Sequence, residues 1–224
     1  MSENVNFHPS SAQLREFGQG TQSTGMTVAV AAHLELCTSC RHLAAEVEKE
    51  LAAQWAADNS VPDTERFDHM LEDITNAPQL TEYASQSSVL PAVHMQEYSV
   101  NLPRVLAKAA GDCLLWKKLA GGINQARLAI DKDTQCDFMY MKPGSQAPRH
   151  THQGTEITLV LEGTFHDELG TYQPGDFIVR RQDQTHTPES DDGCLCFTVL
   201  DSPLTFTTGI ARLLNPFQKL LFNR

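Results

Sequence analysis

Two cysteines and a histidine stand close together in the stretch HLELCTSC, residues 33–40. On a helix, His33 and Cys37 lie one turn apart on the same face, and Cys40 follows three residues later, near a turn. Two thiolates and an imidazole at this spacing can converge on one tetrahedral ion, and this set of ligands favours zinc. The stretch therefore predicts a zinc site with three of its ligands named.

A closed structural zinc site needs a fourth ligand. His8 is our candidate, since the segment that leads into the helices can bring it back across the bundle. His42 is a rival, but it lies two residues beyond Cys40 in the following helix and would point away. Two other interpretations stay open. In one, the CxxC pair is redox-active, although such a pair normally follows a strand. In the other, the cysteines are buried in a core and the nearby histidine is incidental.

A second group of metal-ligand residues occurs in GSQAPRHTHQGTEITLVLEG, residues 144–163. His150 and His152 share one face of a β-strand because successive side chains alternate, and Glu156 can join them from the next strand. A later strand must provide the last ligand, for which His186 is our candidate. His166 competes for this role, but FHDELG is typical of a hairpin end that faces solvent.

This second group has a ligand set that many metals accept. Three imidazoles and a carboxylate bind Zn, Fe, Mn, Ni or Cu, and the spacing does not choose among them. The mouth of a β-barrel is a natural place for such a site. The simpler alternative is a set of unrelated surface histidines and a core glutamate.

Helices are predicted for the first part of the chain, residues 10–75. Ser10 or Ser11 can cap a short helix that ends near Gly18, and a second helix runs from about Met26 to Cys37 without a breaker. Strong helix formers fill the next stretch, RHLAAEVEKELAAQWAADN, and a further helix is predicted from Thr64 to Ile74. The apolar stripe of the third helix consists of Leu43, Val47, Leu51 and Trp55. Together these stretches predict a small helical bundle, which needs an additional cross-link such as a structural metal ion to be stable.

The residue pattern changes after the predicted helices. Residues 76–93 are polar and contain prolines and a serine cluster, which predicts a linker. From about His94, short stretches such as CDFMYM, EITLVLEG, DFIVR and CLCFTVL recur between turn residues, as in an antiparallel β-sandwich or barrel. The last stretch, GIARLLNPFQKLLFNR, predicts an amphipathic helix that packs on its own domain or contacts a partner.

Composition and length limit the possible classes of protein. The 224 residues are 41% apolar, which is enough for real cores, and no run of about 18 apolar residues predicts a membrane span. The start, MSENVNFHPS, lacks the features of a secretory signal, so we expect a cytoplasmic protein with reduced thiols. Cys113 and Cys136 are expected in the core. Cys194 and Cys196, on one strand face, are expected there too, with a redox role as the alternative.

Negative charge is concentrated in the first part of the chain. Residues 1–90 contain 13 Asp and Glu but 4 Lys and Arg, and so carry −9 of the net charge of −11. Such a segment does not suit direct nucleic-acid binding. It suits a basic protein partner, although a solvated helical surface explains the charge equally well.

Both motifs resemble known families. HLELCTSC resembles the HxxxCxxC motif of zinc-binding anti-sigma domains, which are small helical bundles that bind an extracytoplasmic-function sigma factor. In many of them a histidine near the start of the chain completes the zinc site, which implies His8. Residues 144–163 match the first cupin motif at every spacing, and the PGD turn with His186 resembles the second. Asp183 and Gln184 replace the usual proline-x-glycine before that histidine.

In combination, the motifs resemble the ChrR family of anti-sigma factors over nearly the whole chain. The resemblance implies an α + β two-domain fold, with a zinc-stapled helical bundle followed by an antiparallel cupin β-sandwich or barrel. We therefore expect a zinc-binding anti-sigma domain at 1–80, a linker at 81–93, a cupin domain at 94–205 and an amphipathic helix or tail at 206–224.

The resemblance also implies a function. The chain would bind and inhibit an extracytoplasmic-function sigma factor, and release it when the cupin senses singlet oxygen or related oxidants. We expect zinc at the first site, zinc or another divalent metal such as Fe, Mn or Ni at the second, no enzymatic activity, and no nucleic-acid or membrane partner. The alternative is a cupin dioxygenase with an accessory zinc module, which would use an open position on iron. A third interpretation is a small-molecule binding protein whose helices recruit another partner.

Overall fold

The computed structural model describes residues 5–57, 65–78, 92–95, 98–111, 114–216 and 222. Cys113 and most of the predicted linker lie outside the described residues, and nothing is inferred about them. Among the helices that are described, none combines the length and the apolar character that crossing a bilayer requires.

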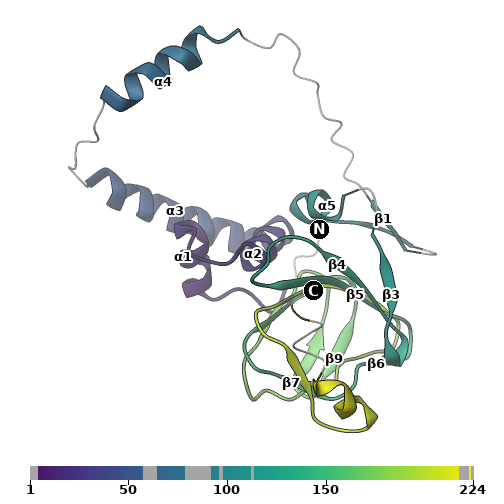
Figure 1. Ribbon diagram of the computed structural model, residues 1–224. Helices are drawn as coiled ribbons and strands as arrows, with labels where there is room; N and C mark the ends of the chain where they lie inside the picture. Colours follow the sequence, from purple (N-terminus) through teal and green to yellow (C-terminus); the bar gives the residue numbers. More distant parts are fainter. Residues whose placement is uncertain are drawn as a thin grey trace.

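The predicted helices are present close to their expected bounds. They are α1 (Ser11–Gln19), α2 (Thr24–Leu36), α3 (Thr38–Ala57) and α4 (Glu65–Asn76). Helices α1 to α3 gather on one side of the strands, whereas α4 lies apart from them (Figure 1). The start of α1 is a capping box, in which Ser10 and Gln13 each bind the other's backbone N–H. Gly20, at a φ of 67°, ends the same helix in the left-handed region that glycine adopts without strain.

The rest of the chain is mainly β-structure. A hairpin and a short helix precede the sheets: β1 (Ala92–Met95), β2 (Tyr98–Asn101) and α5 (Arg104–Ala110). The next elements are β3 (Trp116–Lys118), η1 (Ala120–Gly122), β4 (Ile123–Leu128), β5 (Gln135–Met141), β6 (Ser145–Gln146), β7 (His150–His152) and β8 (Glu156–Gly163). The last are β9 (Phe165–Asp167), β10 (Gly170–Tyr172), β11 (Phe177–Arg180), β12 (Glu189–Ser190), β13 (Cys194–Leu200), β14 (Leu204–Phe206) and η2 (Ile210–Leu214).

These strands form the antiparallel sandwich that the sequence predicts. One sheet has the order β11-β8-β13-β5-β4-β3, and a smaller one has the order β10-β9-β12-β6. A two-stranded sheet pairs β14 with β7, so that Phe206 lies opposite His150. The fold is therefore a helical region followed by a cupin-like β-domain, as expected.

The large sheet is covered on both faces, which explains its apolar strands. In β13, Cys194 and Cys196 face the interior of the sandwich, whereas Leu195, Phe197 and Val199 face the opposite way. All five are buried. A strand covered on both faces loses the alternation of apolar and polar residues, and CLCFTVL therefore reads as one apolar run.

Helices cover the outer face of the large sheet. One hydrophobic cluster includes Leu14 of α1, Val30 of α2 and Leu106 of α5 together with the outward-facing residues of β5, β8 and β13. Helix α2 is apolar around most of its circumference because it packs on the sheet as well as on α3. The helical region thus shares its core with the β-domain.

The end of the described chain returns to the β-domain. The side chain of Asn215 donates to the carbonyl of Phe206 at 2.9 Å and accepts from its N–H at 2.8 Å. Helix η2 forms the start of the helix predicted there, and residues 217–221, 223 and 224 lie outside the described residues.

Gly25 tests the packing of α2 on the sheet. A Cβ at Gly25 would lie 2.2 Å from Thr134 Oγ1 and 2.7 Å from Cys136 Sγ, so any side chain there must push the helix away. We predict that Gly25→Leu lowers the free energy of unfolding by about 1–3 kcal/mol, although replacing a helical glycine normally favours the helix. Chemical denaturation measures this change. Leucine at the exposed Ala53 is the control, with an effect below about 0.5 kcal/mol. Equal stability of the two variants would contradict this packing.

Candidate metal centres

The first cluster consists of His8, His33, Cys37 and Cys40, whose ligand atoms all lie within 4.8 Å of one another. His33 is in the last turn of α2, Cys37 is its C-terminal cap, and Cys40 is in the first turn of α3. His8 comes from the extended segment before α1. The structure thus brings together the four residues that the sequence nominated, while His42 is exposed and lies outside the cluster.

The contacts show which atoms face the centre of this first cluster. His8 Nδ1 lies 3.6 Å from Cys37 Sγ and 3.3 Å from Cys40 Sγ. His33 Nδ1 lies 2.9 Å from the carbonyl oxygen of Gly175, to which it can donate. Its other nitrogen, Nε2, is buried without a hydrogen-bond partner. A buried acceptor with no donor is costly, whereas a metal ion would satisfy it.

Burial sets the protonation states in the first cluster. It lowers the pKa of His33 to about 4, which keeps the imidazole neutral and able to bind a metal. Burial and the neighbouring Cys37 raise the pKa of Cys40 to about 12, so without a metal this group is a thiol. A metal ion that binds here must therefore displace a proton from Cys40, and its affinity for the cluster should fall as the pH falls.

The second cluster consists of His150, His152, Glu156 and His186, all buried. His150 and His152 lie at the two ends of β7, and Glu156 begins β8. His186 follows β11 and is held beside His150 by backbone hydrogen bonds in both directions, at 3.1 and 3.0 Å. The structure places the predicted residues together although the usual proline-x-glycine before His186 is absent.

Three imidazole nitrogens meet at the centre of this second cluster. His186 Nε2 lies 3.0 Å from His150 Nε2 and 3.2 Å from His152 Nε2. His150 Nδ1 bonds the carbonyl of Pro148 at 2.8 Å, so its proton belongs on that side and its Nε2 presents a lone pair to the cluster. Lone pairs this close repel one another unless a cation lies between them.

A carboxylate completes the second cluster. Glu156 Oε2 lies 3.0 Å from His152 Nε2 and 3.5 Å from His186 Nε2. Burial alone would raise the pKa of Glu156, but the three histidines outweigh it and hold the pKa at about 2. Burial also lowers the pKa of His150 to about 4. Neutral imidazole beside ionised carboxylate is the form that binds a divalent metal.

Asp167 orients the second cluster from outside, and the sequence analysis missed it. Its carboxylate accepts from His186 Nδ1 at 3.1 Å, from Arg180 at 2.8 Å and from the hydroxyl of Tyr172 at 2.9 Å. Burial opposes ionisation, but His186 and Arg180 hold the pKa of Asp167 well below its usual range. Such a partner fixes the ring of a ligand histidine. Neighbouring His166, as expected, faces solvent, with a side chain 39% exposed.

The remaining described cysteines are buried. Cys194 and Cys196 share one strand face as predicted, and their sulfur atoms are 3.2 Å apart. The contact with Cys194 and then burial raise the pKa of Cys196 well above its usual value. Both residues and Cys136 belong to hydrophobic clusters, which agrees with their expected place in the core.

Comparison with known proteins connects both clusters to one family. The model of the ChrR Cupin-like domain matches residues 108–202. Anti-sigma-E factor ChrR of Cereibacter sphaeroides is 29% identical over 229 residues, which cover 96% of this chain and 99% of that protein. Over nearly its whole length, the chain is thus similar to an anti-sigma factor of the ChrR family.

Solved structures extend the ChrR similarity to three dimensions. The crystal structure of Rhodobacter sphaeroides SigE in complex with the anti-sigma ChrR matches with a TM-score of 0.71 and 26% identity, over 88% of this chain and 99% of the matched chain. An RmlC-like cupin from Ralstonia eutropha matches 45% of this chain and 71% of its own, with a TM-score of 0.41 and 19% identity. The ChrR match therefore covers the helices as well as the β-domain.

Metal content tests the two clusters separately, since the ligand roles of the eight residues stay a prediction. We predict about two metal equivalents per chain in the wild type, and about one in Cys40→Ser or in His150→Ala, because each change removes one ligand from one cluster. Elemental analysis of purified full-length protein measures this. His42→Ala and His166→Ala are the matched controls and should keep both equivalents. A wild-type content of only one equivalent would contradict the assignment. So would a cluster variant that keeps both equivalents.

Proposed function

We propose that this chain is a ChrR-family anti-sigma factor that binds and inhibits an extracytoplasmic-function sigma factor. The observation that carries the proposal is the similarity to ChrR, which spans nearly the whole chain and includes a ChrR solved in complex with SigE. A regulatory role rather than an enzymatic one follows from the same similarity. As the partner of a sigma factor, the protein would act in the cytoplasm.

The exposed face of α4 offers a surface for such a partner. Its apolar residues fall on one side of the helix at helical spacing. They are Phe67, Met70, Leu71 and Ile74, with exposed fractions of 49%, 52%, 60% and 64%. An apolar helix face of this kind, exposed in the monomer, is typical of a helix that docks into a groove on another protein.

Helix α3 also exposes apolar side chains. Leu43 and Trp55, two of the four residues in its predicted apolar stripe, are 56% and 82% exposed. The other two, Val47 and Leu51, contact α1, and a Cβ at Gly18 would lie 3.0 Å from Leu51. A large exposed tryptophan is a frequent anchor in protein interfaces.

Charge supports the same class of partner. The first 90 residues carry −9, and a protein that binds promoter DNA carries a basic surface. Opposite charges speed association by long-range attraction, while the apolar residues of α3 and α4 would provide the lasting contact. Occlusion of the basic surface would keep the sigma factor from DNA.

The two clusters would have different tasks. At the first, zinc held by His8, His33, Cys37 and Cys40 would tie the segment before α1 to the junction of α2 and α3, so that metal binding supports folding. At the second, zinc or another divalent metal such as Fe, Mn or Ni would supply a Lewis-acidic or redox-active centre. We propose that the cupin domain senses singlet oxygen or related oxidants there, and that the change weakens the hold on the sigma factor.

Substitutions on α4 test the docking surface. We predict that Leu71→Asp combined with Ile74→Asp weakens a one-to-one complex with the cognate sigma factor at least about 30-fold, because buried anchors often contribute 2 kcal/mol or more. Calorimetry with purified proteins measures the affinity. His69→Asp combined with Asn76→Asp adds the same two charges on the polar side of α4 and is the control. Unchanged affinity in the double variant would exclude this face from the interface.

Substitutions in the second cluster test sensing. We predict that His150→Ala with Glu156→Gln keeps sigma binding within about threefold but abolishes release under singlet oxygen, because the binding surface is retained and the sensor is lost. A reporter driven by the sigma factor measures release in cells. His166→Ala, a solvent-facing histidine of the same domain, serves as the control. A normal oxidant response in the double variant would refute sensing at this cluster.

A further inference from the structure

The turn between β10 and β11, residues 173–176, connects the cupin domain to the first cluster. The carbonyl of Gly175 accepts a hydrogen bond from His33 Nδ1 at 2.9 Å. This bond directs His33 Nε2 toward the two cysteines. A residue of the first cluster is therefore oriented by the backbone of the cupin domain.

The same turn holds the segment that carries His8. Asp176 is fully buried, and its Oδ1 accepts from the backbone N–H of Asn6 at 2.7 Å and of Phe7 at 3.1 Å. The N–H of Phe177 donates to the carbonyl of Phe7 at 2.9 Å. These bonds fix the backbone directly before His8. Two of the four residues in the first cluster thus depend on the turn for their position.

Close packing makes the contact stiff. Gly175 has a φ of 94°, and a Cβ there would lie 2.7 Å from Val5 Cγ2 and 4.0 Å from Leu36 Cβ. The turn is therefore in tight contact with the segment before His8 and with the end of α2. Because protein interiors leave few voids, a displacement of the turn must displace these neighbours.

Backbone hydrogen bonds also connect the turn to β8, the strand that carries Glu156 of the second cluster. Gly175 N donates to the carbonyl of Val160 at 2.9 Å, and Val160 N donates to the carbonyl of Asp176 at 3.1 Å. Val160 lies in β8, the strand that begins with Glu156. The position of the turn is thus tied to the strand that supplies the carboxylate of the second cluster.

Side chains provide a second connection to that cluster. Tyr172, at the end of β10, donates to Asp167 at 2.9 Å, and Asp167 accepts from His186 at 3.1 Å. The ring of Tyr172 packs edge-on against the ring of Phe7, with centroids 5.0 Å apart. A continuous series of contacts therefore runs from His186 through Asp167, Tyr172 and Phe7 to the backbone of His8.

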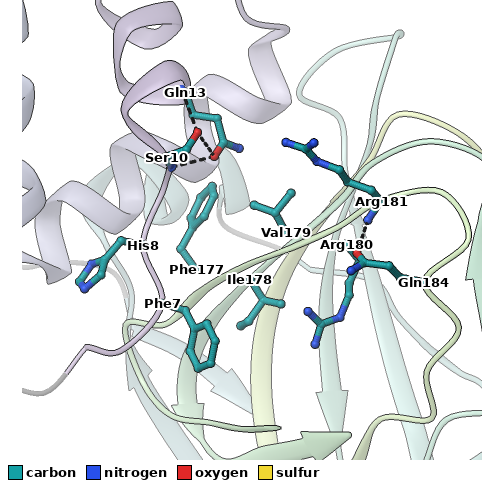
Figure 2. Close-up of a pocket in the computed structure, with 10 residues that line it drawn as sticks. All are labelled: Phe7, His8, Ser10, Gln13, Phe177, Ile178, Val179, Arg180, Arg181 and Gln184. Atoms are coloured by element: carbon teal, nitrogen blue, oxygen red, sulfur yellow. Dashed lines mark hydrogen bonds between the residues drawn. The ribbon is translucent and has the colours of Figure 1, made fainter. Parts of the chain in front are cut away.

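A pocket lies on the other side of the segment that carries His8. Figure 2 shows His8 and Phe7 at the edge of a pocket between the segment and β11. Its volume is about 330 Å³, and Ile178, Val179 and Arg181 also line it. His8 itself is exposed, whereas the other three residues of its cluster are buried.

We propose that the turn 173–176 couples the two metal sites, so that a filled second cluster tightens metal binding at the first. The inference rests on the metal centres of the proposed function but not on the sigma factor. Asp176 acts as a positioning residue, because its carboxylate accepts from the backbone N–H groups of Asn6, Phe7 and Gln173. By thermodynamic linkage, the first site must affect the affinity of the second by the same factor.

Cobalt(II) binding to full-length protein tests the coupling. The absorption of thiolate bound to cobalt reports the first cluster alone, because only that cluster contains cysteine. We expect competition with a chelator to show about tenfold weaker cobalt binding there when His150→Ala and Glu156→Gln disable the second cluster, a factor within the usual range for coupled sites. Equal affinities with the second cluster intact and disabled would overturn the proposal.

Asp176→Ala, examined with and without the disabled second cluster, completes a double-mutant cycle. We expect the tenfold difference to shrink to about twofold or less, since the segment before His8 is no longer held. Asp131→Ala is the matched control. Asp131 is also a cupin carboxylate that binds the backbone of the helical region, at Gly25 N and 2.7 Å, but it lies away from the ligand segment. Asp131→Ala should leave the tenfold coupling intact. If it reduced the coupling as much as Asp176→Ala does, the role of the turn would be overturned.

A milder variant covers the case in which Asp176→Ala fails to fold. Tyr172→Phe removes only the hydroxyl that bonds Asp167 and keeps the ring against Phe7. It should reduce the coupling at least about threefold, and unchanged coupling would contradict the route through Tyr172. Absence of metal from both clusters in the wild type would refute the proposed centres and the coupling together. Binding at both without mutual influence would refute the coupling only.

Discussion

The apolar outer face of the large sheet is the constraint on which the rest of the structure depends. Phe138, Leu159, Phe197 and Val199 point away from the sandwich interior and are buried. Left uncovered, they would expose an apolar surface that a soluble domain does not keep open. Helices α2 and α5 cover it. Once α2 is in place, His33 at its C-terminal end lies beside the turn 173–176, and the first cluster forms at the boundary between helices and sheet.

Local patterns predicted the clusters because their spacing is set within a few residues. His33 and Cys37 are one helical turn apart, and His150 and His152 share a strand face, so the backbone geometry alone brings each pair together. The strands were predictable for a similar reason, since β8 and β13 coincide with the apolar runs EITLVLEG and CLCFTVL. The remaining ligands, His8 and His186, come from more distant segments of the chain, so each was one candidate beside a rival histidine, and the family resemblance then supported the choice.

Contacts between distant parts of the sequence were not predictable in this way. The hydrogen bond from His33 to Gly175 joins residues 142 positions apart, and no sequence pattern near either residue predicts it. Asp167 read as part of a solvent-facing hairpin because its partners, Arg180 and His186, come from later elements. The stripe of α3 shows the same limit. Its periodicity correctly gave one apolar face, but only the fold shows that Val47 and Leu51 are covered while Leu43 and Trp55 are exposed.

The bond between Asp176 and Asn6 has a consequence for folding during synthesis. The two residues are 170 positions apart, so the segment with His8 leaves the ribosome long before the turn that holds it. At a synthesis rate of about 5–20 residues per second, the delay is roughly ten to thirty seconds. The nascent helices can gather zinc through His33, Cys37 and Cys40 during that time. The final closure by His8, however, must await the cupin domain, so a truncated product would carry an incompletely held ion.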